Sequence, residues 1–173
     1  IKRQVTHVLW DPILAEKGGY KHFMHKKIYE QPRALGDTLS ERIADGKVLD
    51  GIFGPKASDI LDKIEHVQIV ACGTSYHAGL IARYWIEEYC KLPCSVEIAS
   101  EYRYRNAVVP PNSVFMTVSQ SGETADTLAA VRSAKAKGYL ATMAICNVPE
   151  SSHPSFHYWY SKVSRTGRSI DGA

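Results

Sequence analysis

The sequence lacks any long apolar run. No segment approaches the ~20 consecutive apolar residues that a membrane-spanning helix requires, and we expect no signal peptide. Basic runs are missing as well, because charges of both signs are interspersed and the formal net charge is only +3. We therefore expect neither a membrane nor a nucleic acid among the partners, and we expect a cytoplasmic protein.

Cysteine is scarce, and its spacing does not indicate a metal site. Only Cys90 and Cys94 lie close together, and no second pair completes a zinc site. His153 and His157 are separated by Pro154, which prevents the helical spacing that would bring the two rings together. We expect no metal and no cofactor, and we expect the thiols to be buried and reduced, as in a cytosolic protein. The cysteines are Cys72, Cys90, Cys94 and Cys146.

What the chain does contain is an alternation of apolar strands and helices. The pattern predicts strands at residues 67–71, 95–98, 113–118 and 139–146, separated by helices at 76–89, 100–105 and 123–137. With 45% apolar residues among 173, the chain can form one compact domain. We predict an α/β fold, a three-layer αβα sandwich with a mostly parallel, flavodoxin-like sheet that is incomplete at its C-terminal edge.

The residues before this unit predict a linker followed by helices. Residues 1–19 are irregular, and the chain begins at Ile1 rather than Met, which indicates a piece of a longer protein. Helices are predicted at 20–30 and 33–45, with Pro32 in the first turn of the second, and a short helix at 58–64. Apolar residues are expected on one side of the first two helices: Phe23, Met24, Ile28, Tyr29, Leu35, Leu39 and Ile43.

The chain is organised around residues 119–127, whose sequence is SQSGETADT. This stretch joins a predicted strand to a predicted helix, and Gly122 permits a close approach of the backbone to a ligand. Free backbone N–H groups at the positive end of a helix dipole form an anion site. The side chains add hydroxyl donors and one amide: Ser119, Gln120, Ser121, Thr124 and Thr127.

A second turn of the same kind follows the first predicted strand. Residues 72–75, CGTS, lead from strand 67–71 into the next helix. Open α/β sheets bind ligands where such turns meet at the carboxyl ends of their strands. The pair favours a phosphorylated ligand, although the hydroxyl residues could also serve only as helix caps.

Several motifs, in order and correctly spaced, give the chain a family resemblance. Residues 71–79 (ACGTSYHAG), 97–105 (EIASEYRYR) and 119–127 resemble the first sugar isomerase (SIS) domain of glutamine–fructose-6-phosphate aminotransferase. Residues 16–24 (EKGGYKHFM) and 28–32 (IYEQP) resemble the segment that leads into that domain. The resemblance runs from about residue 4 to about residue 152.

The resemblance implies a sugar-phosphate site and a place in amino sugar biosynthesis, on the route to UDP-N-acetylglucosamine. The ligand would be fructose 6-phosphate or glucosamine 6-phosphate, with Thr74 against the sugar. The domains would be a linker and helical lead-in (1–55), the SIS domain (56–150) and a tail unlike the family (151–173). The phosphate would be bound by Ser75, Ser119, Gln120, Ser121 and Thr124.

The same comparison implies that the chain binds substrate without performing the chemistry. The family's glutaminase domain, with its N-terminal cysteine, has no counterpart here, and neither do the second SIS domain and the terminal tail. No catalytic residue is therefore named, and the fragment alone is expected to be inactive, while the intact parent would be a homodimer. Lys27 departs from the usual acidic residue of the family.

Charged residues near the two turns are predicted to be structural. Glu123 and Asp126 suit the helix dipole, and Glu97 and Glu101 have structural roles. The other predictions are salt bridges or solvation for Arg103 and Arg105, and a local hydrogen bond for His77.

Two other functions stay open. The chain could be a non-catalytic sugar-phosphate sensor, which an upstream DNA-binding domain would favour. A nucleotide-binding domain is disfavoured, because neither turn contains G-x-G-x-x-G or G-x-x-x-x-G-K-[ST].

Overall fold

The computed structural model describes residues 16–40, 42–49 and 57–146. These residues belong to two compact units, one comprising 1–41 with 164–173 and the other 42–163. Each unit is described by itself. The predictions for residues 1–15 and for the tail, including His153 and His157, lie outside the described residues.

In the first unit, the described residues form one long helix, α2 (Phe23–Ser40). Two helices separated at Pro32 were predicted, and this is wrong: Pro32 lies inside the continuous helix. Proline fixes a helical φ angle, so a helix can continue through it at the cost of one backbone hydrogen bond. The apolar residues that were expected on one side of these helices are exposed: Phe23, Met24, Ile28, Tyr29, Leu35 and Leu39.

A small hairpin replaces the end of the predicted helix 33–45. Strand β1 (Ile43–Ala44) pairs antiparallel with β2 (Lys47–Val48), and Ile43 lies opposite Val48. The two connecting residues, Asp45 and Gly46, have φ angles of 52° and 71°. Positive φ at both central residues is the geometry of a type I′ turn, which suits the right-handed twist of the two strands.

The second unit is built on a parallel four-stranded sheet, as predicted. Its strands are β3 (His66–Ala71), β4 (Cys94–Ile98), β5 (Ser113–Ser119) and β6 (Ala141–Cys146). They run in the order β4-β3-β5-β6, and every neighbouring pair is parallel. All six residues of β3 are buried, as expected for a central strand covered on both faces.

Helices follow the strands in the predicted alternation. A short helix, α3 (Ala57–Leu61), precedes the sheet. Helix α4 (Gly73–Trp85) continues as a π-helical turn, η2 (Ile86–Cys90), and the shorter α5 (Ala99–Tyr104) and α6 (Ala125–Lys135) follow. Helix α4 begins at Gly73, earlier than the predicted residue 76, so Thr74 and Ser75 lie inside its first turn. Among the described helices, none is both long and apolar enough to cross a membrane.

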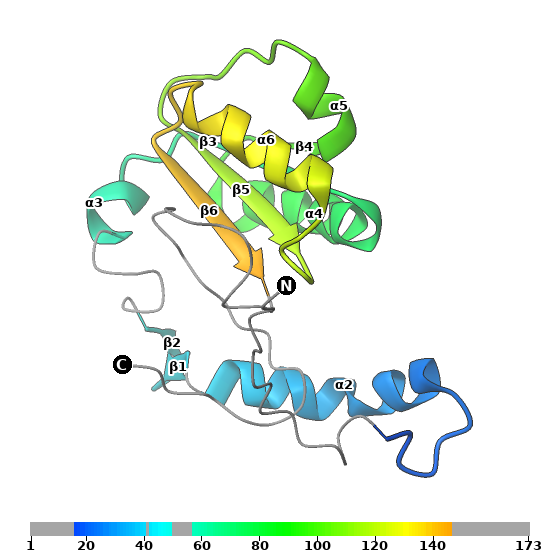
Figure 1. Ribbon diagram of the computed structural model, residues 1–173. Coiled ribbons are helices and arrows are strands. Elements are labelled where there is room, and N and C mark those ends of the chain that lie inside the picture. The colour runs from blue at the N-terminus through cyan, green and yellow to red at the C-terminus, as the bar shows by residue number, and fades with distance from the viewer. Residues whose placement is uncertain (1–15, 41, 50–56, 147–173) are drawn as a thin grey trace, which may run out of the picture. The chain divides into compact units, whose positions relative to one another are not determined.

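The sheet has helices on both faces, which makes three layers (Figure 1). On one face, α5 and α6 cover a core that includes Tyr102, Phe115 and Val131. On the other face α4 approaches the sheet closely at Gly79, where a Cβ atom would lie 3.1 Å from Ile69 Cγ2. The α/β sandwich predicted from the alternation of strands and helices is confirmed.

Candidate functional site

The strand order places a topological switch point between β3 and β5. From β3 the chain crosses through α4 to β4 on one side, and from β5 it crosses through α6 to β6 on the other. Loops that leave neighbouring strands in opposite directions open a crevice at the carboxyl ends, where doubly wound folds bind ligands. The two hydroxyl-rich turns follow these two strands, and Ala71 lies opposite Val118 in the register. The structure thus brings the two turns together.

The turn after β3 leads directly into the first turn of α4. Cys72 is the N-cap residue with an extended backbone (φ −125°, ψ 153°), and its side chain makes no capping hydrogen bond. Gly73 has a φ of +56°, which a residue with a side chain adopts only with strain. Thr74 is exposed and Ser75 half-buried. The first backbone N–H groups of α4 therefore have no side-chain cap.

The turn after β5 is held by its own hydroxyl groups. The buried Ser119 Oγ accepts a hydrogen bond from the Gly122 N–H at 3.0 Å, and Ser121 Oγ accepts one from the Glu123 N–H at 3.2 Å. Gly122 has a φ of +70°. A hydroxyl that accepts such a bond keeps its own proton, so Ser119 and Ser121 can each still donate to a ligand oxygen.

Thr124 occupies the N-cap position of α6 without using its side chain as a cap. Its backbone is extended (φ −63°, ψ 116°), and no capping hydrogen bond forms from the side chain. Thr124 and Gln120 are both exposed. The positive ends of α4 and α6 thus both lack a side-chain cap, and both lie at the carboxyl edge of the sheet, an arrangement suited to an anion.

Thr127, which was expected to add a hydroxyl donor to the turn, uses its hydroxyl for a contact inside the protein. It is buried in the first turn of α6, and its Oγ1 donates a weak hydrogen bond to Cys72 Sγ at 3.8 Å. The contact crosses from one turn to the other. Nothing in the sequence pairs these two residues, because the contact depends on the adjacency of β3 and β5.

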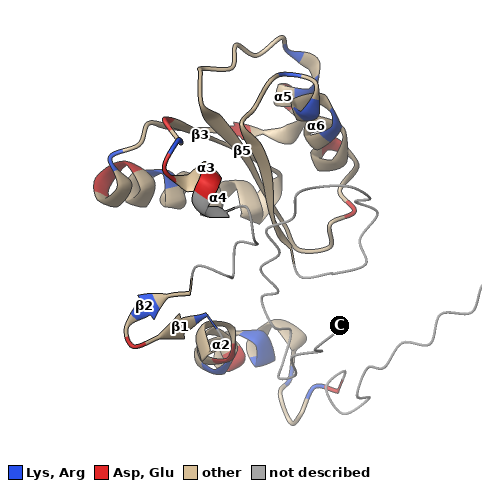
Figure 2. Ribbon diagram, turned by 90° about the vertical axis from the view of Figure 1, so that its left-hand side faces the viewer, with Lys and Arg blue, Asp and Glu red and all other residues tan. Residues whose placement is uncertain are grey.

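The predicted salt bridges of α5 are confirmed. Arg103 Nη1 lies 3.0 Å from Asp126 Oδ1, and Arg105 Nε donates to Glu97 Oε2 at 2.6 Å. The hydrogen bond that it donates to Glu97 raises the pKa of the Arg105 guanidinium. Figure 2 shows basic and acidic residues on α5 and α6. His77 is exposed and makes an edge-on ring contact with Tyr76 in place of the predicted hydrogen bond.

The cysteines are reduced thiols. Cys94 and Cys146 are buried as predicted, Cys72 is half-buried, and Cys90 is exposed, so the prediction is wrong for Cys90. Burial, together with the nearby Glu87, raises the pKa of Cys94 to about 11. In the part of the chain that the structure describes, no group of three His, Cys, Asp or Glu side chains could hold a metal ion.

Comparisons with known proteins agree with this geometry. The family model described as "SIS domain" matches residues 60–158, which is more than half of the chain. The chain belongs to the SIS domain family. Its α/β unit is therefore a SIS domain, and both turns lie within the matched residues.

The SIS domain and its lead-in are similar to named enzymes. The chain is 57% identical over 152 residues to glutamine–fructose-6-phosphate aminotransferase (isomerising) from Haemophilus ducreyi, covering 88% of this chain and 25% of that enzyme. It is 61% identical over 136 residues to the enzyme of the same name from Idiomarina loihiensis, covering 79% and 22%. The resemblance inferred from the motifs is confirmed, and the chain spans about a quarter of the length of these relatives.

Solved structures show the same fold. The C-terminal domain of glucosamine-fructose-6-phosphate aminotransferase from Francisella tularensis matches with a TM-score of 0.80 and 50% identity, over 86% of this chain and 42% of that one. Tagatose-6-phosphate ketose/aldose isomerase from Escherichia coli matches with a TM-score of 0.62 over 84% of this chain and 42% of that one, and at 17% identity it supports the fold alone.

Proposed function

We propose that the SIS domain of this chain binds the phosphate group of fructose 6-phosphate or glucosamine 6-phosphate at the two turns. The observation that carries the proposal is the placement of two neighbouring helix amino ends, neither with a side-chain cap, at the switch point of the sheet. The identity of the sugar phosphate is inferred from the names of the relatives, which include fructose 6-phosphate. The assigned residues are Thr74, Ser75, Ser119, Gln120, Ser121 and Thr124.

The binding mode follows from the chemistry of the two turns. Backbone N–H groups at the amino ends of α4 and α6 face a dianion favourably, and the hydroxyls of Ser75, Ser119, Ser121 and Thr124 donate to its oxygens. Gln120 adds an amide donor, and Thr74 lies against the sugar. Since no Lys or Arg occurs in residues 72–75 or 119–127, dipoles and neutral donors hold the phosphate.

The parent protein would be a glutamine–fructose-6-phosphate aminotransferase of amino sugar biosynthesis, a cytoplasmic homodimer. In this proposal residues 1–55 form the linker and helical lead-in, 56–150 the sugar-phosphate domain and 151–173 the tail. The chain as given would bind the sugar phosphate without turning it over. This assignment rests on the relatives, of which the chain spans about a quarter.

The first test is thermal unfolding with and without fructose 6-phosphate, with unphosphorylated fructose as the control ligand. A ligand stabilises only the state that binds it, so a hundredfold excess over Kd should raise Tm by about 5–10 °C. Fructose should give no shift. A cooperative transition that fructose 6-phosphate leaves unmoved would contradict the proposal.

The second test assigns the site. Replacing Ser121→Ala together with Thr124→Ala should abolish the shift with fructose 6-phosphate and leave the helical content unchanged. The matched control is Ser133→Ala, which removes a half-buried hydroxyl near the other end of α6. Unaltered affinity in the double variant would remove these residues from the site.

A further inference from the structure

The ion pair between Arg103 and Asp126 joins α5 to the first turn of α6. Arg103 Nη1 lies 3.0 Å from Asp126 Oδ1, and the two side chains are 40% and 39% exposed. The Arg103 guanidinium also lies over the Tyr104 ring, 5.0 Å from its centroid. Arg103 therefore brings a positive charge from another helix to the helix that begins at the proposed phosphate turn.

The amino end of α6 carries acidic residues where an anion is proposed to bind. Asp126 follows the N-cap Thr124 by two positions, and Glu123 directly precedes it. Carboxylates at this end of a helix interact favourably with its dipole, but they compete for the same positive end with any other anion. An unpaired carboxylate here would repel a phosphate dianion.

We propose that Arg103 is a positioning residue for the phosphate: by pairing with Asp126, it neutralises the carboxylate beside the turn and leaves the positive end of α6 to the ligand. The inference rests on the proposed function, since it concerns the same site. Arg103 acts through Asp126 and makes no contact with the sugar phosphate.

Because the Arg103–Asp126 pair is partly exposed, a role in ligand binding can be distinguished from a role in folding stability. Ion pairs between side chains this exposed add little to folding stability. Loss of Arg103 should therefore leave the unfolding of the ligand-free chain nearly unchanged while it weakens ligand binding. A folding role would show the opposite pattern.

The test is calorimetric titration of fructose 6-phosphate into the full chain and four variants. Arg103→Gln should weaken binding by roughly 3- to 10-fold, because one uncompensated charge then faces a dianion across a partly screened distance. Asp126→Asn should bind at least as tightly as the unchanged chain. The double variant Arg103→Gln/Asp126→Asn should return to nearly the original affinity, and Arg103→Lys should keep most of it, because charge is what matters.

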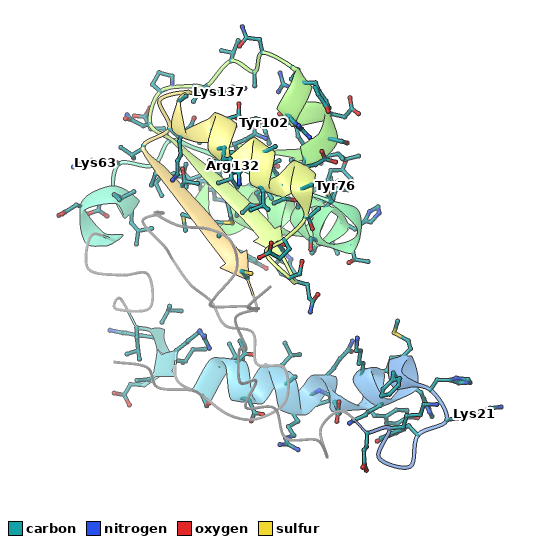
Figure 3. The ribbon with its side chains drawn as sticks, viewed as in Figure 1. Lys21, Lys63, Tyr76, Tyr102, Arg132 and Lys137 are labelled. Carbon is teal, nitrogen blue, oxygen red and sulfur yellow. The ribbon has the colours of Figure 1, made fainter. Side chains whose placement is uncertain are left out.

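Two controls isolate the effect. Arg105→Gln breaks the other ion pair of the α5 region, with Glu97 of β4, and leaves α6 intact. Arg132→Gln removes the same charge from the exposed surface of α6 near its other end (Figure 3). Both should bind fructose 6-phosphate like the unchanged chain.

The outcomes separate this inference from the function on which it rests. If the unchanged chain does not bind fructose 6-phosphate, the proposed function fails and the inference with it. If it binds and Arg103→Gln binds equally well, only the inference fails. The inference would also fail if the double variant bound fructose 6-phosphate as weakly as Arg103→Gln, because Arg103 would then act on the phosphate directly. A large loss of ligand-free stability in Arg103→Gln would overturn the inference too.

Discussion

The hydroxyl of Thr127 donates to the sulfur of Cys72 over 3.8 Å, and this contact joins the two turns of the candidate site. Thr127 belongs to α6, and Cys72 is the N-cap residue of α4. The two helices follow neighbouring parallel strands, and the contact links their amino ends. The spacing of two converging helix ends decides whether both can reach one phosphate.

Removing the Thr127 hydroxyl should weaken phosphate binding more than it weakens folding. Thr127→Val keeps the shape of the buried side chain and loses a weak hydrogen bond, so the free energy of unfolding should fall by less than about 1 kcal/mol. Affinity for fructose 6-phosphate should fall by about 2- to 5-fold as the two turns lose their connection. Calorimetric titration and chemical denaturation measure the two quantities.

Cys72→Ala provides the matched variant, because it removes the acceptor of the same bond. The pair Thr127→Val/Cys72→Ala should lose no more affinity than either single variant, since residues in one contact are not additive. Additive losses would show that Cys72 and Thr127 affect the ligand separately. Thr142→Val, in the edge strand β6, controls for the exchange of Thr for Val.

A pair of phenol hydroxyls lies in the core between the sheet and the helices. Tyr102 and Tyr139 share a hydrogen bond of 2.9 Å, and both rings pack against Phe115. Tyr102 is fully buried, and Lys137 Nζ lies 4.6 Å from its ring centroid (Figure 3). Burial raises the pKa of both phenols, so both stay neutral at physiological pH.

Removing either hydroxyl of the Tyr102–Tyr139 pair should destabilise the fold, but by different amounts. Tyr139→Phe leaves the hydroxyl of Tyr102 buried without its partner, which costs about 1–3 kcal/mol. Tyr102→Phe should cost less, because Tyr139, which then loses its partner, is only half-buried whereas Tyr102 is fully buried. The double variant should be close to the unchanged chain. Urea denaturation of the four proteins measures this cycle, and equal, additive losses would contradict it.

The sheet and the two turns were predictable because their signals are local. Residues 67–71 and 113–118 are short apolar runs bounded by turns, and each precedes a stretch of small hydroxyl residues. Both became strands with the predicted parallel pairing. The order β4-β3-β5-β6 follows from the crossover connections, and no single residue of the sequence encodes it.

The lead-in shows where local signals were misjudged. Asp45-Gly46 is a strong hairpin signal, but the apolar spacing of Leu35, Leu39 and Ile43 suggested a helix that continued through it. Pro32 predicts the start of a helix, but proline fixes the φ angle that a helix requires, and here it lies inside α2. Long-range contacts such as Arg103 with Asp126 need the fold before their partners can be named.

The third prediction concerns a histidine at the amino end of the sheet, opposite the candidate site. His66 is buried at the start of β3, its Nδ1 lies 3.1 Å from Ser113 Oγ, and its Nε2 lies 3.1 Å from Ser95 Oγ. Ser113 Oγ donates its proton to the carbonyl oxygen of Pro110 at 2.6 Å. His66 Nδ1–H must therefore donate to Ser113. Burial lowers the pKa of His66 and so favours the neutral ring, in which Nε2 accepts from Ser95.

This arrangement should make folding stability depend on pH in one direction. Burial lowers the pKa of His66 in the folded chain below the ordinary value of 6.5 that applies when the chain is unfolded. Below pH 6.5 the unfolded chain therefore binds more protons than the folded one, and stability falls as pH falls. The stability that the neutral His66 contributes is fully present above pH 6.5. It is lost as the pH decreases toward the pKa of His66 in the folded chain, by at most about 1.4 kcal/mol per pH unit.

The test of the His66 assignment is how steeply the free energy of unfolding changes with pH, and not its absolute value. The free energy of unfolding in urea, measured from pH 7.5 to pH 5, should fall more steeply for the unchanged chain than for His66→Gln. All other ionisable groups are shared by the two proteins, so the difference between their curves isolates His66. The variant should be less stable at pH 7.5, because Gln cannot reproduce both bonds to Ser95 and Ser113, and the two curves should converge toward pH 5. Parallel curves would mean that protonation of His66 does not oppose folding and that the three strands tolerate a charged ring at their amino ends.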